Sequence, residues 1–202
     1  LVNHFIREVL GLSRFTLLTH DKGDSVGFAF LSLYQQAAPP AYKIDHHVIL
    51  NGGIYLPLAE LSAAQKYLTL PGFGRFMTRF ILTPDRFTAE LAKIYSPALT
   101  QEEQLNMSST FKYQGGTTVF PKTLRYLDDR RELEETWLQT LSRSEIPATL
   151  IWGEQDPIAK TEIADFVWEN HLRNRKAGAA YWRLPCAGHY PQNDQPRVIA
   201  QL

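Results

Sequence analysis

A short polar turn joins two apolar stretches near the start of the chain, and few folds accommodate such a turn. Phe15 to Thr19 is a brief apolar run with β-branched residues, which predicts a buried strand. Val26 to Tyr34 is apolar over a length typical of a helix, and the segment His20 to Asp24 separates the two. The pattern therefore predicts a strand, a tight turn and a helix in immediate succession.

The strand signal recurs later in the chain. Val48 to Leu50, Ala148 to Trp152 and Ala179 to Leu184 are apolar runs, and loops and helical patterns follow the last two. Strands that alternate with helices are typical of βα units on a mostly parallel sheet. We therefore expect an α/β fold.

The sequence pattern changes between about residues 55 and 143. Segments with helical periodicity are separated there by helix-breaking residues, and no strand signal occurs. The breakers are Pro71-Gly72, Pro84, Pro97 and Gly115-Gly116. An insertion that leaves the carboxyl end of a strand would cover a ligand site at that edge of the sheet. We predict three parts: core residues 1–54, an α-helical lid over 55–143, and core residues 144–202.

Composition limits the function classes. Lys plus Arg and Asp plus Glu are 21 each, so no bulk charge favours nucleic acid or an anionic membrane, and we expect a small, largely apolar substrate. No apolar run is long enough to span a bilayer, and the single cysteine, Cys186, is compatible with a reducing compartment. We expect a cytoplasmic protein. Both ends fall within helical patterns, so we also expect the chain to be the C-terminal part of a longer one.

Asp21 occupies the predicted turn. A strand followed at once by a helix forces one residue into a strained conformation, and small neighbours such as Thr19 and Gly23 would relieve the crowding. Asp21 would then present its carboxylate to a cleft beside the start of the helix, whose free N–H groups hold anions. The simpler alternative is that Asp21 only caps the helix.

Ser25 offers a competing nucleophile, because Gly23 to Gly27 matches the serine-hydrolase string G-x-S-x-G. A strand reaching Ser25 would have to run through the polar residues 19–24, which does not suit a buried strand. We therefore favour Asp21 and expect Ser25 early in the helix.

Two further residues complete a candidate triad. Asp156 follows the strand Ala148 to Trp152, and His189 follows the strand Ala179 to Leu184. Their positions differ by 33, which leaves room for one helix and one strand between them. The chain order of nucleophile, acid and histidine is the order that α/β-hydrolases use.

These motifs resemble the branch of the α/β-hydrolases that contains epoxide hydrolases and haloalkane dehalogenases, in which the turn reads His-Asp-x-Gly and aspartate is the nucleophile. The similarity extends to the mesoderm-specific-transcript-like members and covers essentially the whole chain. The motifs that carry it are His20-Asp21-Lys22-Gly23-Asp24, Leu50-Asn51-Gly52-Gly53-Ile54, Trp152-Gly153 with Asp156-Pro157-Ile158, and His189-Tyr190-Pro191-Gln192.

The resemblance implies a two-step mechanism without a cofactor. Asp21 would attack an electrophilic carbon to form an alkyl ester, and His189, oriented by Asp156, would activate the water that hydrolyses it. It also implies that the Lys22 backbone N–H donates to an oxyanion. We assign substrate contacts to Tyr126, His20 and Asn51. A second tyrosine could assist Tyr126 as proton donor, and the candidates are Tyr67, Tyr95 and Tyr113.

Some positions argue against other sites or reactions. Dehalogenases of this branch usually carry tryptophan where Lys22 stands, which counts against halide chemistry, and we expect the Lys22 side chain to be solvated. Cys186 is expected to be a small buried residue. His46-His47 has no evident further ligands, so we predict no metal site there and place the pair at a strand entry. A non-catalytic binding protein with a hydrolase fold remains the third hypothesis.

Overall fold

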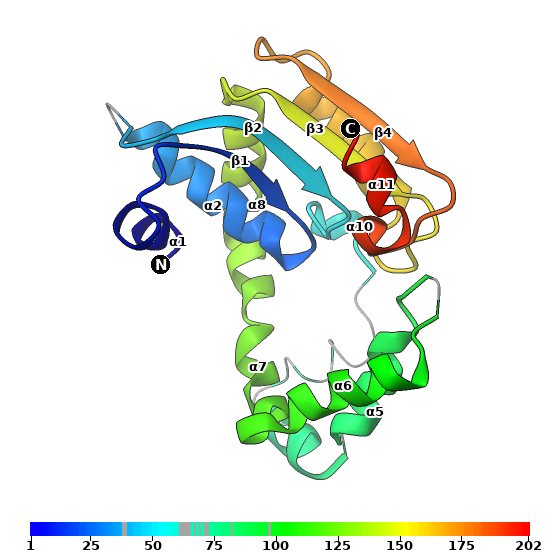
Figure 1. Cartoon of the computed structure of the whole chain (residues 1–202). Helices are drawn as coiled ribbons and strands as arrows, with labels where there is room; N and C mark the ends of the chain where they lie inside the picture. Colours follow the sequence, from blue (N-terminus) through cyan, green and yellow to red (C-terminus); the bar gives the residue numbers. More distant parts are fainter. Residues whose placement is uncertain are drawn as a thin grey trace.

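The computed structural model describes residues 1–37, 40–60, 66, 68, 70, 73–81, 83–96 and 98–202. Its strands are β1 (Arg14–Thr19), β2 (Lys43–Leu50), β3 (Ala148–Gly153) and β4 (Ala179–Leu184). They form one parallel sheet in the order β1-β2-β3-β4, as Figure 1 shows. The predicted α/β class and the positions of all four predicted strands are confirmed.

Helices flank the sheet and form most of the segment between β2 and β3. The α-helices are α1 (Val2–His4), α2 (Lys22–Gln36), α4 (Phe73–Phe76), α5 (Pro84–Ala92), α6 (Gln101–Lys112), α7 (Phe120–Thr123), α8 (Tyr126–Arg143), α9 (Thr161–Val167), α10 (Pro191–Asp194) and α11 (Pro196–Ile199). Further 3₁₀ or π segments lie at Phe5–Val9, Leu56–Leu58, Met77–Ile81, Tyr113–Val119 and Trp168–Leu172. None of the described helices is both long and apolar enough to cross a bilayer.

The core lies on both faces of the sheet, because parallel strands are covered by helices on either side. On one face, Leu31 of α2, Leu141 of α8 and Ile163 of α9 pack against Leu150 and Trp152 of β3. On the other face, a smaller cluster joins the ends of β2, β3 and β4 to α11; its members are Leu50, Ile151, Leu184 and Ala187 with Val48 and Ile199. All six residues of β3 are buried, so β3 is the centre of the fold.

The described residues between 55 and 143 form helices and turns, and Figure 1 shows most of them at a distance from the sheet. A separate apolar cluster holds α5, α6 and α7 together; it contains Leu68, Phe87, Leu91, Phe111, Phe120 and Leu124. The long helix α8 then returns to the sheet and packs along α2. We call residues 55–143 the helical region. Of the predicted breakers, Pro71-Gly72 and Pro97 lie outside the described residues.

Leu150→Ala should lower the free energy of unfolding by about 3 kcal/mol, because it leaves a cavity in the most buried strand, where Leu150 is 0% exposed. Leu105→Ala on α6 is the matched control, since Leu105 is 60% exposed, and should change the value by less than about 0.5 kcal/mol. Urea unfolding followed by circular dichroism measures both. Equal effects would contradict the assignment of β3 to the core.

Candidate active site

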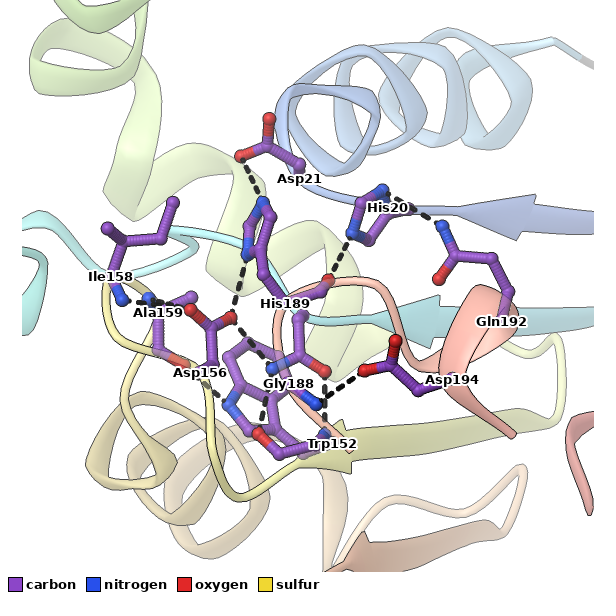
Figure 2. Close-up of polar contacts among 12 residues, drawn as sticks. His20, Asp21, Trp152, Asp156, Ile158, Ala159, Gly188, His189, Gln192 and Asp194 are labelled. Carbon is purple, nitrogen blue, oxygen red and sulfur yellow. Dashed lines mark hydrogen bonds and ion pairs between the residues drawn. The ribbon is translucent and has the colours of Figure 1, made fainter. Parts of the chain in front are cut away.

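The turn at Asp21 has the strained geometry that the sequence predicts. β1 ends at Thr19, α2 begins at Lys22, and Asp21 between them has φ 52° and ψ −119°. A non-glycine residue with positive φ is held there only by its surroundings. The Asp21 N–H donates to the carbonyl of Asn51 at 2.9 Å, and the Asp21 carbonyl accepts from the Asp24 N–H at 3.1 Å. The side chain is 44% exposed and projects toward His189 (Figure 2).

The sequence predicts that Gly23 relieves the crowding at this turn, and the structure places the close contacts at other glycines. A Cβ added at Gly23 would meet nothing within 4 Å, so Gly23 is not needed for space. The close approaches are at Gly27, whose added Cβ would lie 2.5 Å from Cγ2 of Thr19, and at Gly52. At Gly52 it would lie 2.1 Å from Oδ2 of Asp24 and 2.9 Å from the Asp21 carbonyl. The loop after β2, through Gly52, therefore supplies the room for the turn.

Asp156 is fixed by hydrogen bonds to both carboxylate oxygens. Oδ1 accepts from the N–H groups of Ile158 at 2.8 Å and Ala159 at 2.9 Å. Oδ2 accepts from Nδ2 of Asn51 at 2.9 Å and lies 2.7 Å from Nδ1 of His189. The residue is 5% exposed, so the carboxylate is held in one orientation beside the imidazole.

His189 is buried, at 1% exposure, and stands between the two carboxylates. Because Nδ1 faces the Asp156 carboxylate, it carries the proton of that hydrogen bond, and Nε2 is turned toward Asp21. Nε2 lies 3.8 Å from Oδ1 of Asp21 and has no hydrogen-bond partner among the described residues. The structure thus brings together Asp21, Asp156 and His189 from three separate loops, as Figure 2 shows.

His20 and Asn51 support this arrangement, whereas the sequence analysis assigned them to substrate contacts. Nε2 of His20 donates to the carbonyl of His189 at 2.7 Å, and burial lowers the pKa of the His20 imidazole. The Asn51 side chain is fully buried: its Nδ2 donates to Gly153 and Asp156, and its Oδ1 accepts from the Gly153 N–H. Both side chains position loops of the site, and neither lines the pocket beside Asp21.

The histidine loop has two further supports that the sequence analysis missed. Oδ2 of Asp194 accepts from the Gly188 N–H at 2.7 Å, and Nε2 of Gln192 lies 3.5 Å from Nδ1 of His20. Both come from α10, directly after the loop (Figure 2). Short, polar segments of this kind give no signal of their own in the sequence.

A small pocket of about 30 Å³ opens between Asp21 and His189. Tyr126 and Arg130 of α8 contribute to its wall, together with apolar side chains at Leu56, Ala59, Leu127, Ile158 and Ala159. Burial, and then the charge of Asp21, raise the pKa of the Tyr126 phenol, so the phenol keeps its proton at neutral pH.

The other tyrosines named from the sequence lie elsewhere. Tyr95 stacks on Tyr190 with ring centroids 4.1 Å apart. Tyr113 is 72% exposed, and neither it nor Tyr95 lines the pocket. Tyr67 lies outside the described residues.

Ser25 and Lys22 occupy the start of α2. Ser25 is buried in the first turns of the helix, as predicted, and its Oγ accepts hydrogen bonds from Nε and Nη2 of Arg130. The Lys22 backbone N–H has no acceptor within the described part of the chain, so it is free to donate to an oxyanion. Its side chain is less free than predicted, because Nζ donates to the Thr123 carbonyl at 2.9 Å and lies 5.1 Å from the centroid of the Tyr126 ring.

Two other expectations are corrected. Cys186 is exposed rather than buried, because it precedes the point at which the loop turns inward at Ala187. His46 and His47 lie within β2 rather than at its entry, and each contacts a threonine of a neighbouring strand: His46 contacts Thr149 at 2.8 Å and His47 contacts Thr19 at 3.0 Å. Among the described residues no cluster of potential metal ligands occurs.

Asp24 is a buried acid that the sequence analysis did not single out. It is 0% exposed and lies one turn after the nucleophile candidate, and neither carboxylate oxygen has a hydrogen-bond partner at standard distances among the described residues. Burial raises the pKa of Asp24 to about 8, although the nearby Thr19 hydroxyl and Arg130 guanidinium oppose the shift. Asp24 is therefore largely neutral at neutral pH.

Comparisons with known proteins agree with this geometry at the level of the fold. No protein-family model matches the chain. LipZ of Mycobacterium tuberculosis, a hydrolase by name, is 30% identical over 187 residues, which cover 92% of this chain and 62% of LipZ. The mesoderm-specific transcript protein of Mus musculus is 29% identical over 196 residues, 93% of this chain and 56% of that protein. The chain thus spans less than two thirds of the length of these relatives.

Solved structures show the same fold at lower identity. An α/β-hydrolase fold protein from Burkholderia ambifaria superposes with a TM-score of 0.70 at 17% identity, covering 98% of this chain and 68% of that one. The haloalkane dehalogenase DbeA from Bradyrhizobium elkani gives a TM-score of 0.71 at 18% identity, covering 97% and 67%. The chain therefore has the α/β-hydrolase fold.

Gly52→Ala should lower the free energy of unfolding by about 2 kcal/mol or more, because its Cβ would press on Asp24 and on the Asp21 backbone. Gly23→Ala is the matched control and should leave stability unchanged or raise it by up to about 1 kcal/mol, since the position is open and helical. Chemical denaturation of both variants measures the difference. Destabilisation by Gly23→Ala alone would contradict the crowding described for this turn.

Asp24→Asn should become more stable relative to the unmodified protein as the pH rises from 5 to 8. The pKa of Asp24 is about 8 when folded and 3.8 ordinarily, so unfolding releases a proton in this range and a rising pH favours the unfolded chain. Asparagine has no such proton, and the relative gain should reach roughly 2 to 4 kcal/mol.

Urea unfolding at the two pH values measures this effect. Glu145→Gln, at an exposed acid, is the control and should show no such trend. A pH-independent difference between Asp24→Asn and the unmodified protein would mean that Asp24 is ionised in the folded state.

Proposed function

We propose that the protein is a hydrolase that forms an alkyl-ester intermediate on Asp21, with epoxide opening as its reaction. The observation that carries the proposal is the line of groups from Asp21 to His189 to Asp156, in which Nε2 of His189 faces the Asp21 carboxylate at 3.8 Å. LipZ, a relative that is a hydrolase by name, supports the reaction class, and the dehalogenase folds among the structural neighbours are compatible with it.

In the first step, an Asp21 oxygen attacks an epoxide carbon. The new C–O bond forms as the ring C–O bond breaks, and the electron pair leaves with the ring oxygen, which then takes up a proton. A carboxylate is ionised at neutral pH, so this attack needs no base or cofactor. Tyr126 is our candidate for the proton donor, since it lines the same pocket and its raised pKa keeps the phenol protonated.

In the second step, His189 removes a proton from a water molecule, which attacks the carbonyl carbon of the Asp21 ester. The 3.8 Å between Nε2 and Asp21 suits a water between them better than a direct hydrogen bond. Asp156 stabilises the imidazolium that forms, because its carboxylate is already fixed by three other donors. The Lys22 N–H donates to the oxyanion, and loss of the product alcohol restores Asp21.

The substrate in this proposal is a small molecule under a helical lid. The helical region supplies Leu56, Ala59, Tyr126 and Leu127 to the pocket, and the core supplies Asp21 and His189. The Ser25-dependent alternative has less support, because Ser25 is buried against Arg130 and is not at the apex of the turn.

His189→Gln should trap the ester. Without a base at residue 189 the second step slows by roughly 10²- to 10⁴-fold, so a protein exposed to a simple epoxide such as styrene oxide gains the mass of one substrate. Peptide mapping should locate the added mass on Asp21. His4→Gln, at an exposed histidine, is the control and should turn over substrate without accumulating an adduct.

An adduct on Ser25, or turnover retained in Asp21→Asn, would overturn the proposal. Asp21→Asn combined with His189→Gln should give no adduct at all, which distinguishes the ester from nonspecific alkylation of the surface.

A further inference from the structure

Arg130 is a buried cation that the proposed mechanism does not use. It belongs to α8, and only 2% of its surface is exposed. Its Nε donates to Oγ of Ser25 at 3.0 Å, and Nη2 donates to the same oxygen. The guanidinium therefore reaches from the helical region to the first turn of α2, directly after Asp21.

The charge of Arg130 has no carboxylate partner within 4.0 Å in the described part of the chain. Three acids act on it from a greater distance: Asp24, Asp21 and Glu134. Asp24 is largely neutral because its pKa is about 8, and Glu134 already accepts from the Leu56 N–H at 2.6 Å. Asp21 is the proposed nucleophile. A buried charge is ordinarily paired, so this cation is unusual.

The free edge of the guanidinium lies at the pocket. Nη1 has no acceptor among the described residues, and Arg130 lines the pocket together with Asp21, His189 and Tyr126. Nη1 lies against Gly53, where an added Cβ would come within 2.9 Å of it. The absence of a side chain at Gly53 therefore leaves room for the guanidinium at this wall of the pocket.

A second cation stands nearby. The Arg130 Cζ and the Lys22 Nζ lie 5.6 Å and 5.1 Å from the centroid of the Tyr126 ring. Of the charged residues that line the pocket, Glu60 is ion-paired with Lys160, whereas Arg130 has no carboxylate partner within 4.0 Å in the described part of the chain. A carboxylate on the substrate would supply that partner.

We propose that Arg130 anchors a carboxylate of the substrate, so that the protein acts on short epoxy acids in which the electrophilic carbon adjoins the carboxylate. This inference rests on the proposed function and replaces the apolar substrate expected from the sequence with a small monoanion. A guanidinium offers a planar pair of N–H groups that suits a carboxylate. The pocket is small, which favours a short acid over a longer one.

The chemistry remains that of the proposed mechanism. Asp21 forms a C–O bond to a carbon of the epoxide, the ring C–O bond breaks, and the ring oxygen takes a proton. One water then hydrolyses the ester, so the net reaction converts a 2,3-epoxy acid and water into a 2,3-dihydroxy acid. Arg130 exchanges no proton and holds the substrate in place for the attack.

The test compares two probes that differ in charge, glycidate (oxirane-2-carboxylate) and its neutral amide, glycidamide. The unmodified protein should have a kcat/KM at least tenfold higher for glycidate. Arg130→Met should lower kcat/KM for glycidate by roughly 10- to 100-fold and change that for glycidamide less than about threefold, because only the anion loses a charged hydrogen bond. Arg131→Met, at the exposed neighbour that pairs with Asp128, is the matched control and should change neither.

A binding measurement separates this inference from the proposed function. Asp21→Asn cannot form the ester, yet it should bind glycidate in isothermal titration calorimetry, and Asp21→Asn combined with Arg130→Met should not. Binding without turnover of any epoxide would overturn the proposed function and leave the anchor intact. Equal kcat/KM for glycidate and glycidamide in the unmodified protein would overturn the anchor, whether or not Arg130→Met folds.

Discussion

The carboxylate of Asp156 is the interaction on which the rest of the site depends. Its two oxygens take hydrogen bonds from the loop after β3, from Asn51 at the end of β2 and from His189 after β4. In a parallel sheet these strand ends meet at one edge, and a single buried acceptor there can fix the relative position of three loops. The orientation of His189 toward Asp21 follows from that network, because the imidazole has one nitrogen committed to Asp156 and only the other is available for chemistry.

The strained turn at Asp21 is the complementary requirement. A positive φ at a non-glycine residue costs about 1–3 kcal/mol and persists only where neighbouring structure prevents relaxation. Here the Asp21 N–H is held by the Asn51 carbonyl, and Gly52 in the next loop lets the Asp21 backbone and the Asp24 side chain approach closely. Asn51 and Gly52 are adjacent in sequence, so one short segment at the end of β2 both orients Asp156 and supports the turn at Asp21.

Features that depend on residues close together in the chain were predicted from the sequence, and features that depend on contacts between distant residues were missed. Strands, the turn at Asp21, and the order of Asp21, Asp156 and His189 depend on local periodicity and turn chemistry, which a single chain displays directly. The roles of Asn51 and Gly52 depend on the pairing of β2 with β1 and β3, and those of Asp24 and Arg130 on the packing of α8 against α2. Such contacts join residues as far apart as Ser25 and Arg130, and they leave no periodic trace.

The G-x-S-x-G string shows that the structural role of a motif depends on where it lies relative to the strand and the helix. Ser25 is one turn too late to be the apex, and its hydroxyl instead accepts two hydrogen bonds from Arg130, which ties α8 to the turn at Asp21. The same two helices are joined further along by Ser32 and Thr140, whose hydroxyls lie 3.0 Å apart, and by Gln35, whose amide donates to the Thr140 carbonyl at 2.9 Å. Because α2 and α8 are packed as one unit, Arg130 and Tyr126 keep a fixed position relative to Asp21, although both belong to the helical region. In our proposals, substrate recognition and nucleophilic attack are thus built on the same rigid pair of helices.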